Sequence, residues 1–137
     1  MSALTLSTAQ AIVTGALAHA RAAAMKPLAV IVLDAGGHPL AFAREDGASF
    51  ARIDIARAKA TGALGMEADS AVLAERAKGN PVFFQSVSVA LGGAIAFSPG
   101  GVLVRAGGAI VGAVGISGDT GENDDVAARA GLSAAGL

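Results

Sequence analysis

The sequence predicts an α/β chain of the α+β kind, in which helices cover a five-stranded antiparallel sheet. Two observations lead to this fold class. Segments with helical spacing of apolar residues alternate with five short apolar runs of strand type. Neighbouring strand runs are joined by Gly-Gly turns, and hairpin connections make neighbouring strands antiparallel. The 137 residues have the usual length of one domain, so residues 1–137 are expected to form a single unit.

The N-terminal part predicts a helix followed by a hairpin. Ser7 is expected to cap the helix, with Gln10 completing a capping box, and Pro27 to mark its end. The runs Leu28–Leu33 and His38–Arg44 are expected to be strands on either side of a Gly-Gly turn. The apolar face of the helix consists of Ile12, Val13, Ala16, Leu17, Ala20, Ala23 and Ala24.

The middle of the chain predicts a helix that Ser49 caps and that runs to about Leu64, and a weaker helix from roughly Ser70 to Lys78. No charge occurs between Lys78 and Arg105, and this stretch is long enough to span a bilayer. However, prolines, serines and glycines divide it into short pieces. We therefore expect loops and buried strands here, and no membrane helix.

The C-terminal third predicts three strands and a helix. The strands are Ala94–Phe97, Val102–Arg105 and Ala109–Ser117, with Gly107-Gly108 as the hairpin turn between the last two. Thr120 is expected to cap the final helix. Acidic residues in its first turn suit the positive end of the helix dipole: Glu122, Asp124 and Asp125.

Composition narrows the class of protein. Hydrophobic residues make up 53% of the chain and charged residues 15%, so apolar surface should remain for an interface between copies, and a homo-oligomer is expected. A net charge of −1 offers no basic stripe for nucleic acid. The absence of cysteine excludes disulfides and thiolate chemistry, and no metal site is predicted. Residues 1–10 lack the pattern of a signal peptide, so a cytoplasmic protein is expected.

Three segments, in order along the chain, resemble the motifs of one family. They are residues 34–48 (DAGGHPLAFAREDGA), residues 55–61 (IARAKAT), and residues 100–104 (GGVLV) followed by 110–125 (IVGAVGISGDTGENDD). Each segment alone is merely rich in glycine, but the three in register cover nearly the whole chain. On these motifs the chain resembles the GlcG/HbpS-like family. One departure is Leu103, which stands where the family usually has proline and is expected to reshape the pocket wall beside Gly100-Gly101.

The resemblance implies a profilin-like fold with a five-stranded antiparallel sheet between helices. It also implies homo-oligomers, from dimers to octamers, and binding of haem or another tetrapyrrole, or else a role beside the enzymes of a catabolic pathway. The family includes haem-binding proteins and the C-terminal domain of PduO-type adenosyltransferases. The resemblance supplies no catalytic mechanism.

Several residues are candidates for a ligand site, each with a plainer structural alternative. Arg44, Asp46 and Gly47 either form a tight turn or face a polar pocket at the end of the sheet. Lys59 is either solvated or a cation whose head faces an acidic ligand. Gly100 and Gly101 either shape a loop or let backbone amides approach a carboxylate.

The two histidines are the candidate haem ligands, because the chain has no cysteine or tyrosine. His19 lies at the edge of the apolar face of the first helix, where a partly buried side chain can form a pocket wall. His38 lies at a hairpin tip. Both side chains can equally be partly exposed surface residues, but His19 is the better candidate.

Three functions therefore remain open. The first is a small-ligand-binding protein for haem, another tetrapyrrole or a small organic molecule. The second is a lyase, hydratase or isomerase acting on a small organic acid, with Lys59, Arg44 and Asp46 as acid, base and carboxylate-binding groups. The third is an oligomeric accessory protein that needs no pocket chemistry.

Overall fold

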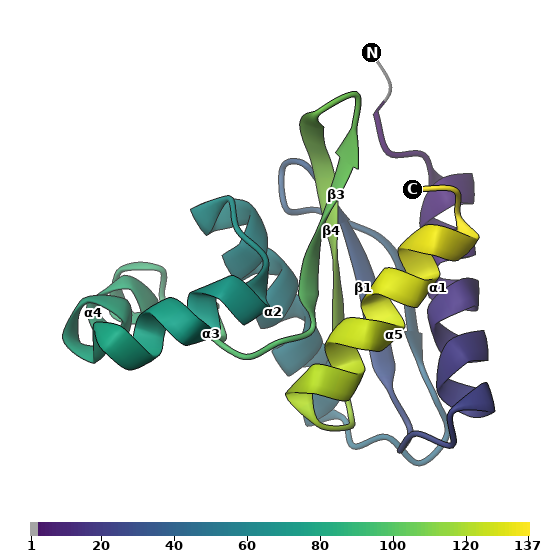
Figure 1. Ribbon diagram of the computed structural model, residues 1–137, viewed down its shortest axis with the longest axis horizontal. Helices are drawn as coiled ribbons and strands as arrows, with labels where there is room; N and C mark the ends of the chain where they lie inside the picture. Colours follow the sequence, from purple (N-terminus) through teal and green to yellow (C-terminus); the bar gives the residue numbers. More distant parts are fainter. Residues whose placement is uncertain (1–2) are drawn as a thin grey trace.

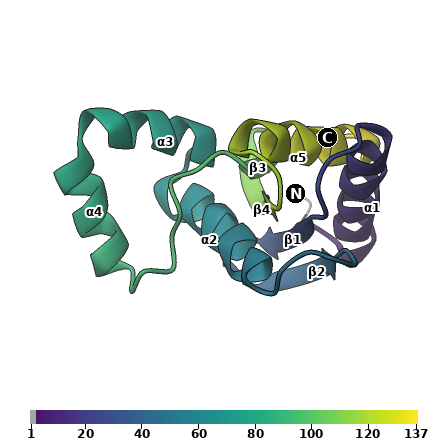
Figure 2. The same cartoon turned by 90° about the horizontal axis from the view of Figure 1, so that it is seen from below.

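A computed structural model describes residues 3–137 as a sheet with helices on both faces (Figure 1). Met1 and Ser2, part of the segment in which no signal peptide is expected, lie outside the described residues. In chain order the elements are α1 (Leu6–Ala22), β1 (Ala29–Asp34), β2 (Pro39–Arg44), α2 (Ala51–Met66), α3 (Ser70–Gly79), α4 (Pro81–Ala90), β3 (Gly101–Ala106), β4 (Ala109–Ser117) and α5 (Gly121–Ala134). Helices α1 and α5 cover one face of the sheet and α2 the other, while α3 and α4 project beyond it (Figure 2).

The sheet is antiparallel, with strand order β2-β1-β4-β3. Each face of the sheet carries its own apolar core. Because successive side chains of a strand point to opposite faces, a strand contributes residues to both cores. Val30, Val114 and Ile116 pack against α1 and α5, whereas Ile31 and Ala113 pack against α2. Burial on both faces explains why β1 and β4 are continuously apolar.

Within residues 3–137 the sheet has four strands, so the prediction of five was wrong. The segment 94–97 packs on α2 instead: the Ala96 amide donates to the Ala58 carbonyl at 3.2 Å, and Ile95 fits against Gly62. It cannot pair with β3, because side chains already occupy that strand's outer edge. Ser70 Oγ accepts from the Gly101 amide at 2.7 Å, and Asp69 Oδ1 from the Leu103 amide at 2.9 Å.

Helix α4 corrects the expectation of loops and buried strands between Lys78 and Arg105. Pro81 occupies the first turn of α4, where its missing N–H costs nothing. Phe84 anchors the helix by an edge-to-face contact with Phe97, with ring centroids 5.0 Å apart. No helix in the described part of the chain is long and apolar enough to cross a membrane.

The helix starts also differ in detail from the prediction. Thr5, and not Ser7, caps α1 by accepting the Thr8 amide at 3.1 Å. Helix α2 starts at Ala51 without a side-chain cap, so the cap predicted at Ser49 is wrong. Thr120 caps α5 as predicted, accepting the Asn123 amide at 3.2 Å.

Candidate functional site

Lys59 is buried and joins the two helical layers past the end of the sheet. Its Nζ donates to Asp124 Oδ2 and to the Ile116 carbonyl, both at 3.0 Å. The side chains of Lys59 and Asp124 are 4% and 1% exposed. Lys59 belongs to α2 and Asp124 to α5, on opposite faces, so this pair connects elements that the sheet separates.

Glycines make room for this connection. A Cβ at Gly100 would lie 3.0 Å from Lys59 Nζ and 2.6 Å from the Ile116 carbonyl oxygen. A Cβ at Gly101 would collide with the backbone carbonyl of Lys59 and lie 3.0 Å from Ser70 Oγ. The structure therefore brings Lys59, Gly100 and Gly101 together in a closed, packed junction.

Two carboxylates at the start of α5, those of Asp119 and Asp124, lie next to this junction and have shifted pKa values. Burial raises the pKa of the Asp124 carboxyl, and the Lys59 ammonium acts in the opposite direction. Asp124 Oδ1 also accepts the Asp119 amide at 3.0 Å. The pKa of Asp119 is lowered to about 2, because its carboxylate accepts hydrogen bonds from the Lys26 amide and from Asn123 and Thr120. Through these hydrogen bonds the two carboxylates connect the N-terminus of α5 to Lys26 and to Lys59 of α2.

The turn after β2 forms a separate polar cavity of about 440 Å³, lined by Arg21, Pro27, Arg44, Glu45 and Asp46. Glu45 accepts the Leu28 amide at 2.8 Å and pairs with Arg21 at 2.9 Å. Arg44 donates to the Ala48 carbonyl at 3.3 Å, and Gly47 turns the chain at φ +87°. The structure thus brings Arg44 and Asp46 together at an exposed turn, whereas Lys59 does not line this cavity.

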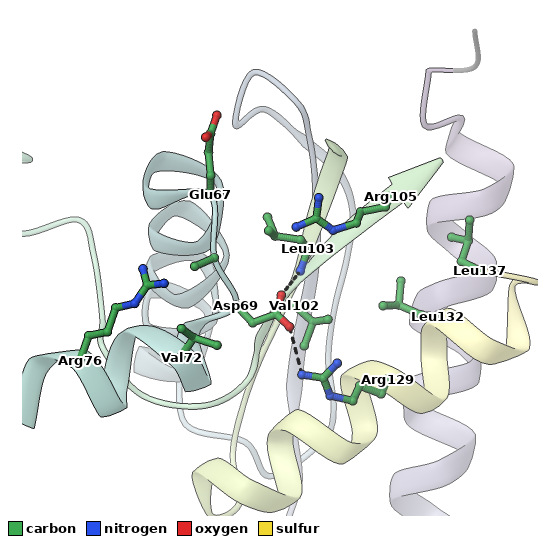
Figure 3. A pocket seen from close by; sticks show the side chains of 11 residues that line it. Glu67, Asp69, Val72, Arg76, Val102, Leu103, Arg105, Arg129, Leu132 and Leu137 are labelled. Atoms are coloured by element: carbon green, nitrogen blue, oxygen red, sulfur yellow. Dashed lines mark hydrogen bonds and ion pairs between the residues drawn. The ribbon is translucent and has the colours of Figure 1, made fainter. Parts of the chain in front are cut away.

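A second cavity, about 490 Å³, lies where α3, β3 and α5 meet (Figure 3). We call it the arginine cleft; it is lined by Glu67, Ala68, Asp69, Val72, Arg76, Val102, Leu103, Arg105, Arg129, Leu132 and Leu137. Asp69 stands inside it, with Oδ1 on the Leu103 amide and Oδ2 3.0 Å from Arg129. Arg129 also pairs with Asp125 at 2.8 Å.

Leu103 lines the arginine cleft, whereas Gly100 and Gly101, beside which it was expected to shape a pocket, do not. Its side chain is buried against α2, and its amide faces outward because β3 is an edge strand. A proline would be tolerated on such an edge but would offer no amide to Asp69. The bond from Leu103 to Asp69 thus requires a residue with a backbone N–H at this position.

His19 is half-buried on α1. One turn earlier, Gly15 allows the helices to touch, since a side chain there would collide with Ala134 and approach Gly131. Helical spacing places His19 on the same side of α1 as Gly15, the side that meets α5. His38 is exposed, with Nδ1 3.2 Å from Asp34. Across residues 3–137 no three metal-ligating side chains cluster.

Sequence reasoning did not find the partners of the candidate residues. Asp124 was interpreted as a dipole-favouring residue, although it is the buried partner of Lys59. Asp69, Arg76, Arg105 and Arg129 were not singled out. The sequence contains one local signal for the arginine cleft, the charge of Arg105 at the end of an otherwise apolar strand. The other charged residues of the cleft come from separate elements, so no local pattern brings them together.

Comparisons with known proteins agree on one family. The family model described as haem degrading protein HbpS-like matches residues 4–133. A double mutant of Streptomyces reticuli HbpS is 30% identical, with a TM-score of 0.83 over 97% of this chain and 87% of that chain.

Two further structures share the fold. Klebsiella pneumoniae protein ORFY is 24% identical, with a TM-score of 0.91 over 100% of this chain and 93% of that chain. A complex of PduOC with heme is 24% identical, with a TM-score of 0.88 over 97% of this chain and 95% of that chain. Among curated proteins, none matches. The chain belongs to the HbpS-like family.

Proposed function

We propose that this protein binds haem or a related tetrapyrrole, with His19 as the iron ligand. The observation that carries the proposal is the position of His19, half-buried one helical turn after Gly15, where α1 contacts α5. Imidazole is a common axial ligand of haem iron. The other histidine, His38, is exposed and bonded to Asp34. Membership of the HbpS-like family and the likeness to a heme complex of PduOC support the same ligand class.

Hemin titration tests this proposal. We expect the wild type to give a sharp Soret band with a saturable titration, and His19→Ala to weaken hemin binding at least about tenfold, because the iron loses its protein ligand. His38→Ala serves as the matched control and should bind as the wild type does. No spectral change in the wild type would refute haem binding, and loss of the band only in His38→Ala would move the iron ligand to the hairpin.

We propose further that the protein is a homo-oligomer, between a dimer and an octamer, in which α4 is buried. Val82, Phe83 and Val89 of this projecting helix are 75%, 50% and 77% exposed. Val82 and Val89 also line a shallow apolar cavity of about 440 Å³ on the same helix. Apolar side chains gathered on one projecting element are typical of an interface.

Native mass measurement tests this interface. Val89→Asp places a charge on the exposed apolar face, so we expect the oligomer to dissociate to a smaller species while circular dichroism stays unchanged. Val89 makes no contribution to the described core, which keeps the fold out of the result. A wild-type protein that has the mass of one chain, or a variant whose mass is unaltered, would contradict the proposal.

A further inference from the structure

The arginine cleft contains two guanidinium groups that no carboxylate of residues 3–137 neutralises. Arg76 on α3 and Arg105 at the end of β3 are exposed and form no ion pair within these residues. Arg129 differs, because Asp69 and Asp125 both pair with it. Figure 3 shows the head groups of Arg76 and Arg105 turned toward the cleft from opposite walls, whereas the carboxylate of Glu67 points away from it.

The lining between the two arginines is mixed, because Asp69 and Arg129 lie there beside aliphatic side chains. Val72 on α3 and Leu132 on α5 contribute these aliphatic side chains, whereas the side chain of Leu103 is buried against α2. The volume, about 490 Å³, lies within the range of small-molecule pockets. A cleft of this kind offers a ligand a charged rim and aliphatic contacts.

Asp69 keeps the rim positive. It is the carboxylate that lies within the cleft, but the Leu103 amide holds one of its oxygens and Arg129 holds the other. Asp69 is thereby fixed to β3 and α5 and does not pair with Arg76 or Arg105. Because a proline at position 103 would have no amide to donate, this arrangement depends on the residue at that position.

We propose that the arginine cleft binds a small organic acid, with its carboxylate held by the guanidinium groups of the rim, Arg76 and Arg105, and its hydrocarbon chain against Val72 and Leu132. Guanidinium groups present forked donors that match the two oxygens of a carboxylate. The aliphatic side chains favour an acid with a hydrocarbon chain over a fully polar one. His19 does not line this cleft, so the site is independent of the haem proposal.

Hexanoate titrated into ¹⁵N-labelled protein tests the proposal, with hexan-1-ol as the uncharged counterpart. We expect saturable amide shifts in Val72, Val102 to Arg105 and Leu132, and much weaker shifts with hexan-1-ol. Arg76→Gln and Arg105→Gln should each weaken hexanoate binding about tenfold, because each removes a charged donor. Arg57→Gln, an exposed arginine on α2, is the matched control and should bind as the wild type does.

Each other outcome decides against the site. Equal binding of hexan-1-ol, or unchanged affinity in both cleft variants, would overturn the role of the arginines. Shifts confined to the Arg44 turn or to the part of α1 around His19 would overturn the location. His19→Ala should leave hexanoate binding intact, so failure of the haem proposal and failure of this one are distinguishable. Both cleft arginines are exposed, and the spectra themselves report whether the variants fold.

Discussion

Replacing Lys59 by methionine is expected to lower the free energy of unfolding at pH 7 by about 3–5 kcal/mol. Methionine keeps the aliphatic stem but removes the ammonium, and the carboxylate of Asp124 is left buried without its cation. The Ile116 carbonyl loses a donor as well. Urea denaturation of both proteins measures the difference.

The pH dependence of this variant gives a second readout. Burial raises the pKa of Asp124 in the folded protein, and the variant no longer has Lys59 to oppose that effect. An acid whose pKa is raised on folding costs stability above its unfolded pKa and regains it as the pH falls. The difference in free energy of unfolding between the wild type and Lys59→Met should therefore become steadily smaller as the pH falls from neutral toward pH 4.

Two further proteins make the Lys59 test specific. The double variant Lys59→Met with Asp124→Asn should recover most of the lost stability, because no buried charge remains. Lys78→Met removes an exposed lysine whose partner is Glu75, and should leave the free energy of unfolding nearly unchanged, because solvent screens the exposed pair. A Lys59→Met protein within about 1 kcal/mol of the wild type would show that the buried pair contributes little.

Gly101→Ala is expected to lower the free energy of unfolding by about 3 kcal/mol or more, or to prevent folding altogether. The new methyl group would collide with the backbone carbonyl of Lys59, which cannot rotate away as a flexible side chain can. Helix α2 would have to move off the sheet, and the Ser70 bond to the Gly101 amide would be strained. Thermal and urea unfolding measure the loss.

Gly65→Ala is the matched control for this substitution. Gly65 belongs to α2, the helix on which Gly101 packs, but a methyl group at Gly65 would meet no atom within 4 Å. Within a helix the exchange should raise stability by about 1 kcal/mol. If Gly101→Ala were as stable as the wild type, Gly101 would be available for the ligand contact that the sequence also allows.

Hairpins were the part of the fold that the sequence specified most closely. Strand β4 has the predicted bounds, because Gly107 and Gly108 both adopt positive φ angles that favour glycine and fix the turn. The segment 94–97 was mistaken for a strand because a short apolar run looks alike in a strand and in a coil packed on a helix. What excluded it was the pair of side chains on the edge of β3, contributed by Asp69 and Ser70.

The site was less predictable for a different reason. A helical wheel places Lys59 a quarter turn from the core, which fits both a solvated and a buried lysine. Its burial depends on Asp124, 65 residues away, and on the missing side chain of Gly100. The arginine cleft likewise assembles residues from three elements, so no local pattern reveals it. Leu103 was singled out from the sequence, but as a wall residue beside Gly100-Gly101, which do not line the cleft.

The Lys59–Asp124 pair has a consequence for how the molecule opens. Local unfolding usually begins with an element that few contacts hold in place. Helix α5 is the last element of the chain, but Asp124 connects it by an ion pair to α2 on the other side of the sheet. Detaching α5 alone would leave Lys59 as an unpaired cation in the core. The two helical layers therefore form one cooperative unit, and their slowest amides should exchange with solvent only when the whole sheet opens.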